Sequence, residues 1–366
     1  MGLLDYYRQF EGRPKEEVNR ELRARATEER RLALERVDPI DLSSTTWPEL
    51  PPSTVVNAVT FVARRGLQRY LEPRAGELRS ELAHRLDVPP ERLVVGNGAA
   101  QLLGSATSAL LEPGDALVTP WPSYPLYPVM ARQAHGTAVP VAVGSSHTVE
   151  AVLRAVDDRT RIVALCNPND PTGEWLDEHA LRTLLGGLPE RVVVLLDEAL
   201  VEYAPFSAAP LTVQFPRLLV FRSFSKAWGL AGLRIGYAIG GPGSEPLLER
   251  LEPELGVNEL AQAGALEALR SAEDVLARRV ATVRAERARL TDVLRGRGLH
   301  VARSEANVLW IGADGIDGGE LAARLHRAKV RVAEGARFGD PSRIRVAVQT
   351  RPAGDRLLAA RAGVLG

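Results

Sequence analysis

Short apolar segments rich in Val, Leu and Ile recur along most of the chain, and helix-like segments separate most of them. The apolar runs occupy residues 93–95, 116–119, 138–143, 161–165, 192–196, 218–221 and 235–239. Strands that alternate with helices favour a parallel sheet with helices on both faces. The sequence therefore predicts an α/β fold, whose large domain holds a mostly parallel sheet of about seven strands covered by helices.

The pattern differs before and after these runs. Residues 15–37 are dense in Glu and Arg with a sparse apolar stripe, which predicts an amphipathic helix that packs on the body of the protein or on a second subunit. After a Gly-Gly-Pro-Gly break at residues 240–243, a long helical stretch and short strands near 305–311 and 343–348 predict a smaller α+β domain. We therefore predict an N-terminal helical arm over residues 1–46, a large domain over 47–243 and a small C-terminal domain over 244–366.

Composition and charge narrow the classes of function. With 366 residues and 45% hydrophobic content the chain can bury a full core, and its 46 basic residues balance 46 acidic ones. This balance gives no overall field to attract nucleic acid or an anionic membrane, and no apolar run approaches the roughly 20 residues that span a bilayer. The single cysteine excludes an intrachain disulfide, and the six histidines lack metal-ligand spacing. We expect a cytoplasmic protein without a metal site.

Lysine is rare in this chain, and one lysine stands out by its neighbours. The chain has three lysines against 43 arginines, and Lys226 ends the Ser-Phe-Ser-Lys motif of residues 223–226. Arginine keeps its proton near neutral pH, whereas a desolvated lysine can lose it and act as an amine nucleophile. Lys15 and Lys329 fit solvated surface positions, so Lys226 is the candidate nucleophile.

Small or polar residues directly follow several of the predicted strands, where ligands of parallel sheets bind. Ala99 and Ala100, in a glycine-rich turn, offer backbone N–H groups at the start of a helix, although such turns also use glycine for geometry alone. Tyr124 offers an aromatic face to a flat ligand, or a core side chain. Asp197 ends a buried strand, where a carboxylate needs a cation or a hydrogen-bond donor; a helix cap or structural ion pair is the alternative.

The residues around the candidate nucleophile are hydrogen-bond donors. Ser223 and Ser225 precede Lys226, and Arg234 follows it by eight residues. Two hydroxyls and a guanidinium suit a phosphate group, and an amine suits an aldehyde. This combination indicates an aromatic aldehyde that carries a phosphate.

Together these motifs resemble those of the fold-type I pyridoxal phosphate (PLP) enzymes of the class I/II aminotransferase family, most closely the histidinol-phosphate aminotransferase branch, from about Trp47 to the C-terminus. The resemblance implies that Lys226 forms a Schiff base with PLP and later moves the substrate proton, and that Asp197 pairs with the pyridine nitrogen. It also implies that Tyr124 stacks on the ring, and that a further set binds the phosphate: Ala99, Ala100, Ser223, Ser225 and Arg234.

The same resemblance implies contacts from more distant positions. Tyr70 resembles the tyrosine that reaches the phosphate of the neighbouring subunit, which implies a homodimer with shared active sites. Arg345 resembles the arginine that binds the substrate α-carboxylate, with a surface position on an edge strand as the alternative interpretation. Trp47 and Trp228 are candidates for an apolar or aromatic substrate pocket, with core packing as the alternative.

Two positions depart from the pattern of the family. Where the family usually has Asn before Pro-Thr-Gly and Tyr after Asp-Glu-Ala, this chain has Asp170 and Leu200. Both usual residues donate hydrogen bonds to the phenolic oxygen of PLP, whereas an ionised carboxylate only accepts and leucine has no polar group. Asp170 remains a candidate cofactor-binding residue, on the condition that it faces elsewhere or that one of the two partners holds a proton.

The implied function is transfer of an amino group between an amino acid, or a related amine, and a 2-oxo acid through PLP on Lys226. A decarboxylase related to the threonine-phosphate decarboxylases is one alternative, because the same cofactor activates either bond at the amine-bearing carbon. Arg345 as a carboxylate-binding residue favours transamination. A non-enzymatic PLP-binding protein is the other alternative, motivated by Asp170 and Leu200 but opposed by the intact lysine, aspartate and arginine motifs.

Overall fold

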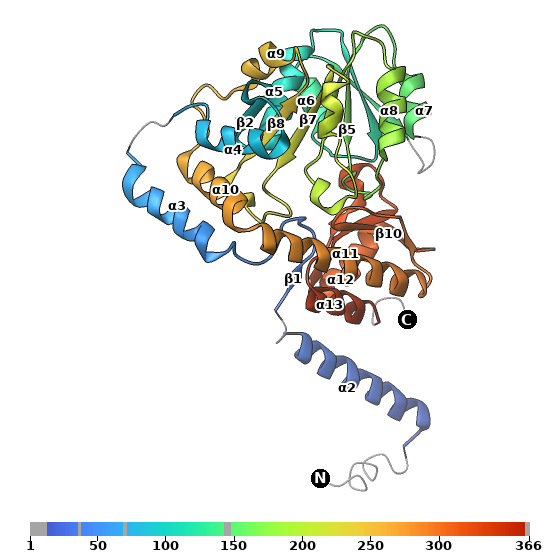
Figure 1. Ribbon diagram of the computed structural model, residues 1–366. Coiled ribbons are helices and arrows are strands. Elements are labelled where there is room, and N and C mark those ends of the chain that lie inside the picture. The colour runs from blue at the N-terminus through green and yellow to red at the C-terminus, as the bar shows by residue number, and fades with distance from the viewer. Residues whose placement is uncertain (1–12, 36–37, 69–71, 143–147, 363–366) are drawn as a thin grey trace.

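The central feature of the computed structural model is a seven-stranded sheet with the strand order β2-β8-β7-β6-β5-β3-β4 (Figure 1). The structure describes residues 13–35, 38–68, 72–142 and 148–362. The strands are β2 (Leu93–Gly96), β3 (Ala116–Trp121), β4 (Thr137–Ala142), β5 (Thr160–Cys166), β6 (Val193–Asp197), β7 (Leu218–Ser223) and β8 (Gly236–Gly240). Neighbours from β4 to β7 run parallel, whereas β8 is antiparallel to both β2 and β7. The predicted seven-stranded, mostly parallel sheet is confirmed, and the direction of β8 adds a detail that the pattern did not predict.

Helices cover both faces of this sheet, which explains why its strands are continuous apolar runs. In β6, Leu195 belongs to an apolar cluster with α5 (Ala99–Leu110), α6 (Tyr127–Gln133) and α9 (Glu245–Leu251). Its neighbours Val194 and Leu196 point to the other face and join α7 (Thr148–Ala155) and α8 (Glu178–Gly187). Near β2 and β8 this second face is covered by α4 (Gly76–Leu86) and α10 (Glu259–Ser271). Alternate side chains of one strand therefore build two separate cores.

The C-terminal part of the chain forms a smaller antiparallel sheet with the order β12-β13-β10-β9. Its strands are β9 (His300–Val301), β10 (Val308–Gly312), β12 (Ala333–Glu334) and β13 (Arg343–Ala347), and its helices are α11 (Glu273–Arg295), α12 (Gly318–Arg327) and α13 (Arg351–Ala362). The two strands that the sequence predicts here are β10 and β13. The others have two residues each, too few to show a periodic pattern.

Short 3₁₀ helices connect several of these elements. They are η1 (Pro90–Arg92), η2 (Val201–Tyr203), η3 (Ala209–Val213), η4 (Ala231–Leu233) and η5 (Gly335–Phe338). Of these, η2 follows β6, and η4 lies between β7 and β8. Both lie next to the carboxyl ends of strands, and η4 contributes Ala231 to the cavity described below.

The N-terminal region has two parts, of which only the second packs on the C-terminal part of the chain. The predicted helix is present as α2 (Lys15–Glu35), which stands apart from both sheets in Figure 1. The segment that follows packs on the C-terminal part, because β1 (Ile40–Asp41) pairs with β11 (Val330–Arg331) and Leu42 lies in the same apolar cluster as Val330. After it comes α3 (Ser53–Gly66), which lies against α10. The domain limits of the sequence analysis, and packing of α2 on a second subunit, stay predictions.

Candidate active site

A cavity of about 240 Å³ lies at the carboxyl ends of the parallel strands. Nine of the predicted site residues line this cavity, although they come from five separate segments of the chain. Its lining residues are Thr46, Ala99, Ala100, Tyr124, Cys166, Asp170, Asp197, Ala199, Leu200, Ser223, Ser225, Lys226, Ala231 and Arg234. The structure thus brings the predicted site together at the edge of the sheet where parallel strands place ligands.

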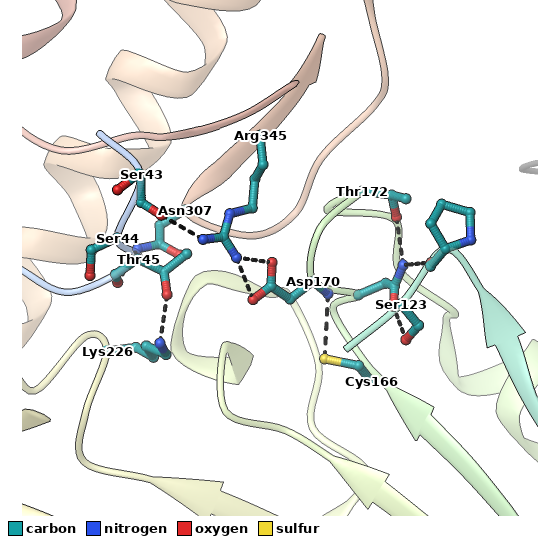
Figure 2. Close-up of polar contacts among 12 residues, drawn as sticks. Ser43, Ser44, Thr45, Ser123, Cys166, Asp170, Thr172, Lys226, Asn307 and Arg345 are labelled. Carbon is teal, nitrogen blue, oxygen red and sulfur yellow. Dashed lines mark hydrogen bonds and ion pairs between the residues drawn. The ribbon is translucent and has the colours of Figure 1, made fainter. Parts of the chain in front are cut away.

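Lys226 lies just beyond the end of β7, with its amine inside the protein. Its Nζ donates a hydrogen bond to Oγ1 of Thr45 at 2.5 Å (Figure 2). Burial lowers the pKa of Lys226, and the charge of Arg345 adds to this shift, whereas the carboxylates of Asp170 and Asp197 oppose it. A lysine with a lowered pKa has more neutral amine at a given pH and is a better nucleophile.

Asp197 ends β6 and is 5% exposed. One carboxylate oxygen, Oδ1, accepts a hydrogen bond from the backbone N–H of Ala199 at 2.9 Å, and Oδ2 lies 3.5 Å from the hydroxyl of Tyr127. Burial raises the pKa of Asp197 to about 6, while the Ala199 N–H and the charge of Lys226 act in the opposite direction. The site therefore needs a further cation or donor to keep this carboxylate ionised at low cost.

A further group of lining residues consists of hydrogen-bond donors. The first backbone N–H groups of α5, at Ala99 and Ala100, have no partner within the helix. Nη1 of Arg234 lies 3.5 Å from Oγ of Ser225, and both line the cavity with Ser223. Such a set of two hydroxyls, a guanidinium and a helix N-terminus fits a phosphate group.

The backbone at Gly98 makes room for this group of donors. Gly98 has φ +91°, and a Cβ atom there would lie 2.8 Å from Nη2 of Arg234. Only glycine leaves the guanidinium in place next to the start of α5. With the ring of Tyr124, the carboxylate of Asp197 and the amine of Lys226 along the same cavity, the residues present fit PLP from its phosphate to its aldehyde.

Substitution of Gly98 by alanine tests this fit. We expect Gly98→Ala to weaken PLP binding by roughly tenfold or more, equivalent to about 1.4 kcal/mol, because the methyl group displaces Arg234. Gly114→Ala is the matched control, since Gly114 has φ +99° but open space around its missing Cβ. Both variants should lose about 1–3 kcal/mol of stability through backbone strain. Titration with PLP and urea denaturation check the prediction, and an unchanged dissociation constant for Gly98→Ala would contradict it.

Asp170 and Arg345 form an ion pair. Nη1 of Arg345 donates to Oδ1 and Oδ2 of Asp170 at 2.6 and 2.8 Å, and Nη2 donates to the backbone oxygen of Ser43 at 2.6 Å (Figure 2). Asp170 lines the cavity, whereas Arg345 is not among the lining residues. The sequence left open whether Asp170 faces elsewhere or one of the two partners holds a proton. In the structure its carboxylate faces elsewhere, toward the guanidinium of Arg345. Arg345 lies in β13 with 8% exposure, so it is not a surface arginine.

The remaining predicted residues lie away from the cavity. Trp47 packs against the C-terminal apolar cluster, and the guanidinium of Arg279 lies 5.3 Å from the centre of its ring. Trp228 packs against Phe224, with ring centres 5.6 Å apart. Neither tryptophan is among the lining residues, and a substrate role for Trp47 stays a prediction. Tyr70 falls outside the described residues.

Four residues in or next to the site were missed in the sequence. Thr45, which accepts from Lys226, lies 181 positions away from it, and Asn307 in turn donates to the backbone oxygen of Thr45 at 2.9 Å. Tyr127 lies within α6 and resembles any core tyrosine, and Cys166 is a half-buried residue at the end of β5. Only Cys166 carried a signal, because it directly follows the strand predicted over residues 161–165.

A partly buried lysine and a buried aspartate beside a phosphate-type donor set, at the edge of this sheet, define a PLP-dependent enzyme of fold type I. The chain belongs to the family of class I and II aminotransferases, whose profile matches residues 37–361. It is 37% identical to an aromatic amino acid aminotransferase of Corynebacterium efficiens, over 82% of this chain and 88% of that protein. It is 34% identical to histidinol-phosphate aminotransferase 1 of Nitrosococcus oceani, over 92% of this chain and 88% of that protein.

Solved structures agree with this assignment. The fold matches histidinol-phosphate aminotransferase from Sinorhizobium meliloti in complex with pyridoxal 5′-phosphate, with a TM-score of 0.81, 26% identity, and coverage of 91% of this chain and 93% of that one. It also matches an aspartate aminotransferase from Thermotoga maritima, with a TM-score of 0.82, 26% identity, and coverage of 94% and 96%. The chain is therefore a PLP-dependent aminotransferase that uses an amino acid or related amine and a 2-oxo acid. The non-enzymatic alternative is set aside, and the decarboxylase alternative gains no support from these relatives.

Proposed function

We propose that Lys226 binds the aldehyde carbon of PLP and later moves the substrate proton, while Asp197 faces the pyridine nitrogen. The observation that carries this proposal is that both side chains line one cavity together with the phosphate-type donors. When bound, PLP supplies an electron sink that weakens the bonds at the amine-bearing carbon of the substrate. Every other contribution comes from side chains of this chain.

Lys226 is the residue that transfers the proton. Its burial favours the neutral amine, which accepts a proton from the amine-bearing carbon and returns it to the reacting system. Thr45 orients Nζ through its hydroxyl oxygen. Asp197 stays ionised when it faces a protonated ring nitrogen, because the cation offsets the desolvation that raises its pKa.

The phosphate end fixes the position of the cofactor. Arg234 and the hydroxyls of Ser223 and Ser225 form charge-assisted hydrogen bonds with a phosphate, next to the N-terminus of α5. Tyr124 supports the ring and is itself held edge-on by Tyr127, with ring centres 5.4 Å apart. Neither Asp170 nor Leu200 donates a hydrogen bond to the phenolic oxygen, because one is paired with Arg345 and the other is apolar.

For the amino donor we propose an aromatic or apolar side chain. Two observations support this proposal: the apolar Leu200 lines the cavity, and relatives such as that of Corynebacterium efficiens are named for aromatic amino acids. An acidic side chain on the donor is disfavoured, because it would lie near the carboxylates of Asp170 and Asp197, which line the same cavity.

A panel of amino donors tests the reaction. We expect the visible absorption band of the PLP-loaded protein to disappear with a good donor and to return when a 2-oxo acid is added, because transamination conserves the amino group. Aromatic donors should react faster than acidic ones. Release of carbon dioxide without recovery by the 2-oxo acid would instead establish the decarboxylase.

We also propose a homodimer with shared active sites that works in the cytoplasm. Large apolar side chains are exposed along and beside α3, including Val56, Phe61 and Leu67, with exposed fractions of 41%, 59% and 73%. Among the described residues no helix is long and apolar enough to cross a bilayer, and no group of three or more metal-ligating side chains gathers. Light scattering should give about twice the chain mass of 39.7 kDa. A mass of one chain would refute the dimer.

A further inference from the structure

The Asp170–Arg345 pair lies where a substrate carboxylate was expected. By the resemblance, Arg345 is the residue that holds this carboxylate, yet in this chain its guanidinium already holds one. Both oxygens of Asp170 accept from Nη1 at 2.6 and 2.8 Å (Figure 2). The exposed fractions of the two side chains are 9% for Arg345 and 12% for Asp170, so little water screens the pair.

The rest of the guanidinium is engaged or covered. Nη2 donates to the backbone oxygen of Ser43 at 2.6 Å, and the ring of Phe338 lies 4.6 Å from Cζ. Nε is buried, and the described residues offer it no hydrogen-bond partner. Both terminal nitrogens therefore already donate, so a substrate carboxylate that binds them as a pair has to displace an acceptor that is present now.

The loop that carries Asp170 is fixed by its own contacts. The side chain of Asn169 accepts from Oγ of Ser123 at 2.7 Å and donates to the backbone oxygen of Pro122 at 3.0 Å. It also donates to Oγ1 of Thr172 at 2.9 Å. On the other side, Ser43 lies two residues before Thr45, which is held by Lys226 and Asn307. Both the loop that carries Asp170 and the segment that carries Ser43 are therefore held by their own hydrogen bonds. Separation of Asp170 from Arg345 disturbs these fixed segments.

The charge that a substrate meets is thus negative. Asp170 lines the cavity with Lys226, whereas Arg345 is not among the lining residues. A second carboxylate near Arg345 has to displace Asp170 from a buried pair and then stay next to its charge, both of which are unfavourable. An amine without that carboxylate leaves the pair intact.

We propose that Asp170, paired with Arg345, takes the place of a substrate carboxylate, and that the preferred amino donor carries no carboxylate on its amine-bearing carbon. The inference rests on the proposed function, since it assumes that this cavity binds the donor. Asp170 is then the residue that determines specificity. The 2-oxo acid acceptor, which carries a carboxylate, has to compete with Asp170 for Arg345 and binds weakly.

Equilibrium binding of an unreactive carboxylate tests the inference without turnover. In the PLP-loaded full-length protein, titration calorimetry with 3-phenylpropanoate should show binding at least about tenfold tighter to Asp170→Asn than to wild type. Asparagine keeps the shape of Asp170 but removes the competing charge. Asp158→Asn, at a side chain fully exposed to solvent, changes the net charge equally and should leave the affinity unchanged. Equal affinity of wild type and Asp170→Asn, including no binding by either, would overturn the inference.

Matched donors separate this inference from the proposed function. Wild type should react faster with 2-phenylethylamine than with phenylalanine, which differ only in the carboxylate, and Asp170→Asn should reverse or abolish that preference. Asp170→Asn should also lower the KM for the 2-oxo acid acceptor. If wild type reacts faster with phenylalanine, the specificity inference fails while the proposed function stands. If neither compound nor any donor of the wider panel reacts with PLP-loaded wild type, the proposed function itself fails.

Discussion

Replacement of Lys226 by alanine is expected to lower turnover by at least about 10³-fold, because it removes both the nucleophile and the group that moves the proton. Lys226→Arg should lose as much, since arginine keeps a positive charge but no nucleophilic amine. Rates of the half-reaction, followed through the visible absorption band, check both variants.

Lys329→Arg provides the control for the lysine variants. Lys329 lies in the turn before β11, and its backbone oxygen accepts from Ile40, so its side chain has no part in the cavity. It should retain the activity of the wild type. Substantial activity in Lys226→Arg, with correct folding and bound PLP, would contradict a covalent role for Lys226.

Replacement of Asp197 by asparagine is expected to lower the rate of the half-reaction by roughly 10²–10³-fold, because a neutral amide does not stabilise a protonated ring nitrogen. The shape of the side chain and its contact with the Ala199 N–H are retained, so folding should be preserved. Asp158→Asn again serves as a control of equal charge at an exposed position. A change of less than threefold in Asp197→Asn would remove this residue from the mechanism.

The same carboxyl gives a pH dependence in the cofactor-free protein. Burial raises the pKa of Asp197 from 3.8 to about 6, so its contribution to stability is complete below 3.8 and is lost as the pH rises through about 6. The loss amounts to at most about 3 kcal/mol. Urea denaturation at pH 5 and pH 7 should show a larger fall in the free energy of unfolding for wild type than for Asp197→Asn. An equal fall in both proteins would contradict the raised pKa.

The sheet was predictable because burial on both faces leaves a visible pattern. The strands of the large sheet other than the edge strand β4 are mostly buried apolar runs, since helices cover both sides. The direction of β8 was not predictable from that pattern. Residues 224–235, between β7 and β8, hold the lysine motif and η4 rather than a crossover helix. Parallel neighbours need such a crossover, and without one the next strand returns antiparallel.

The lining of the cavity was predictable for a related reason. Asp197, Ser223 and Lys226 each come at or just after the end of a strand, and strand ends in a parallel sheet meet at one edge. Contacts between distant segments left no such signal. Asp170 and Arg345 are 175 positions apart, and Thr45 and Lys226 are 181 apart. These pairs join loops at the strand ends of the large sheet to β13 or to the N-terminal segment that packs on the C-terminal part of the chain.

Reduction of the PLP-loaded protein with borohydride tests most directly whether Lys226 binds PLP. Reduction makes the bond between the lysine and PLP permanent, so that peptide mass mapping can locate it. The chain has only three lysines, at positions 15, 226 and 329, which makes the assignment unambiguous. We predict a phosphopyridoxyl group on Lys226 and on neither of the others. Modification of Lys15 or Lys329 in its place, or of no lysine in a protein that has bound PLP, would contradict the account.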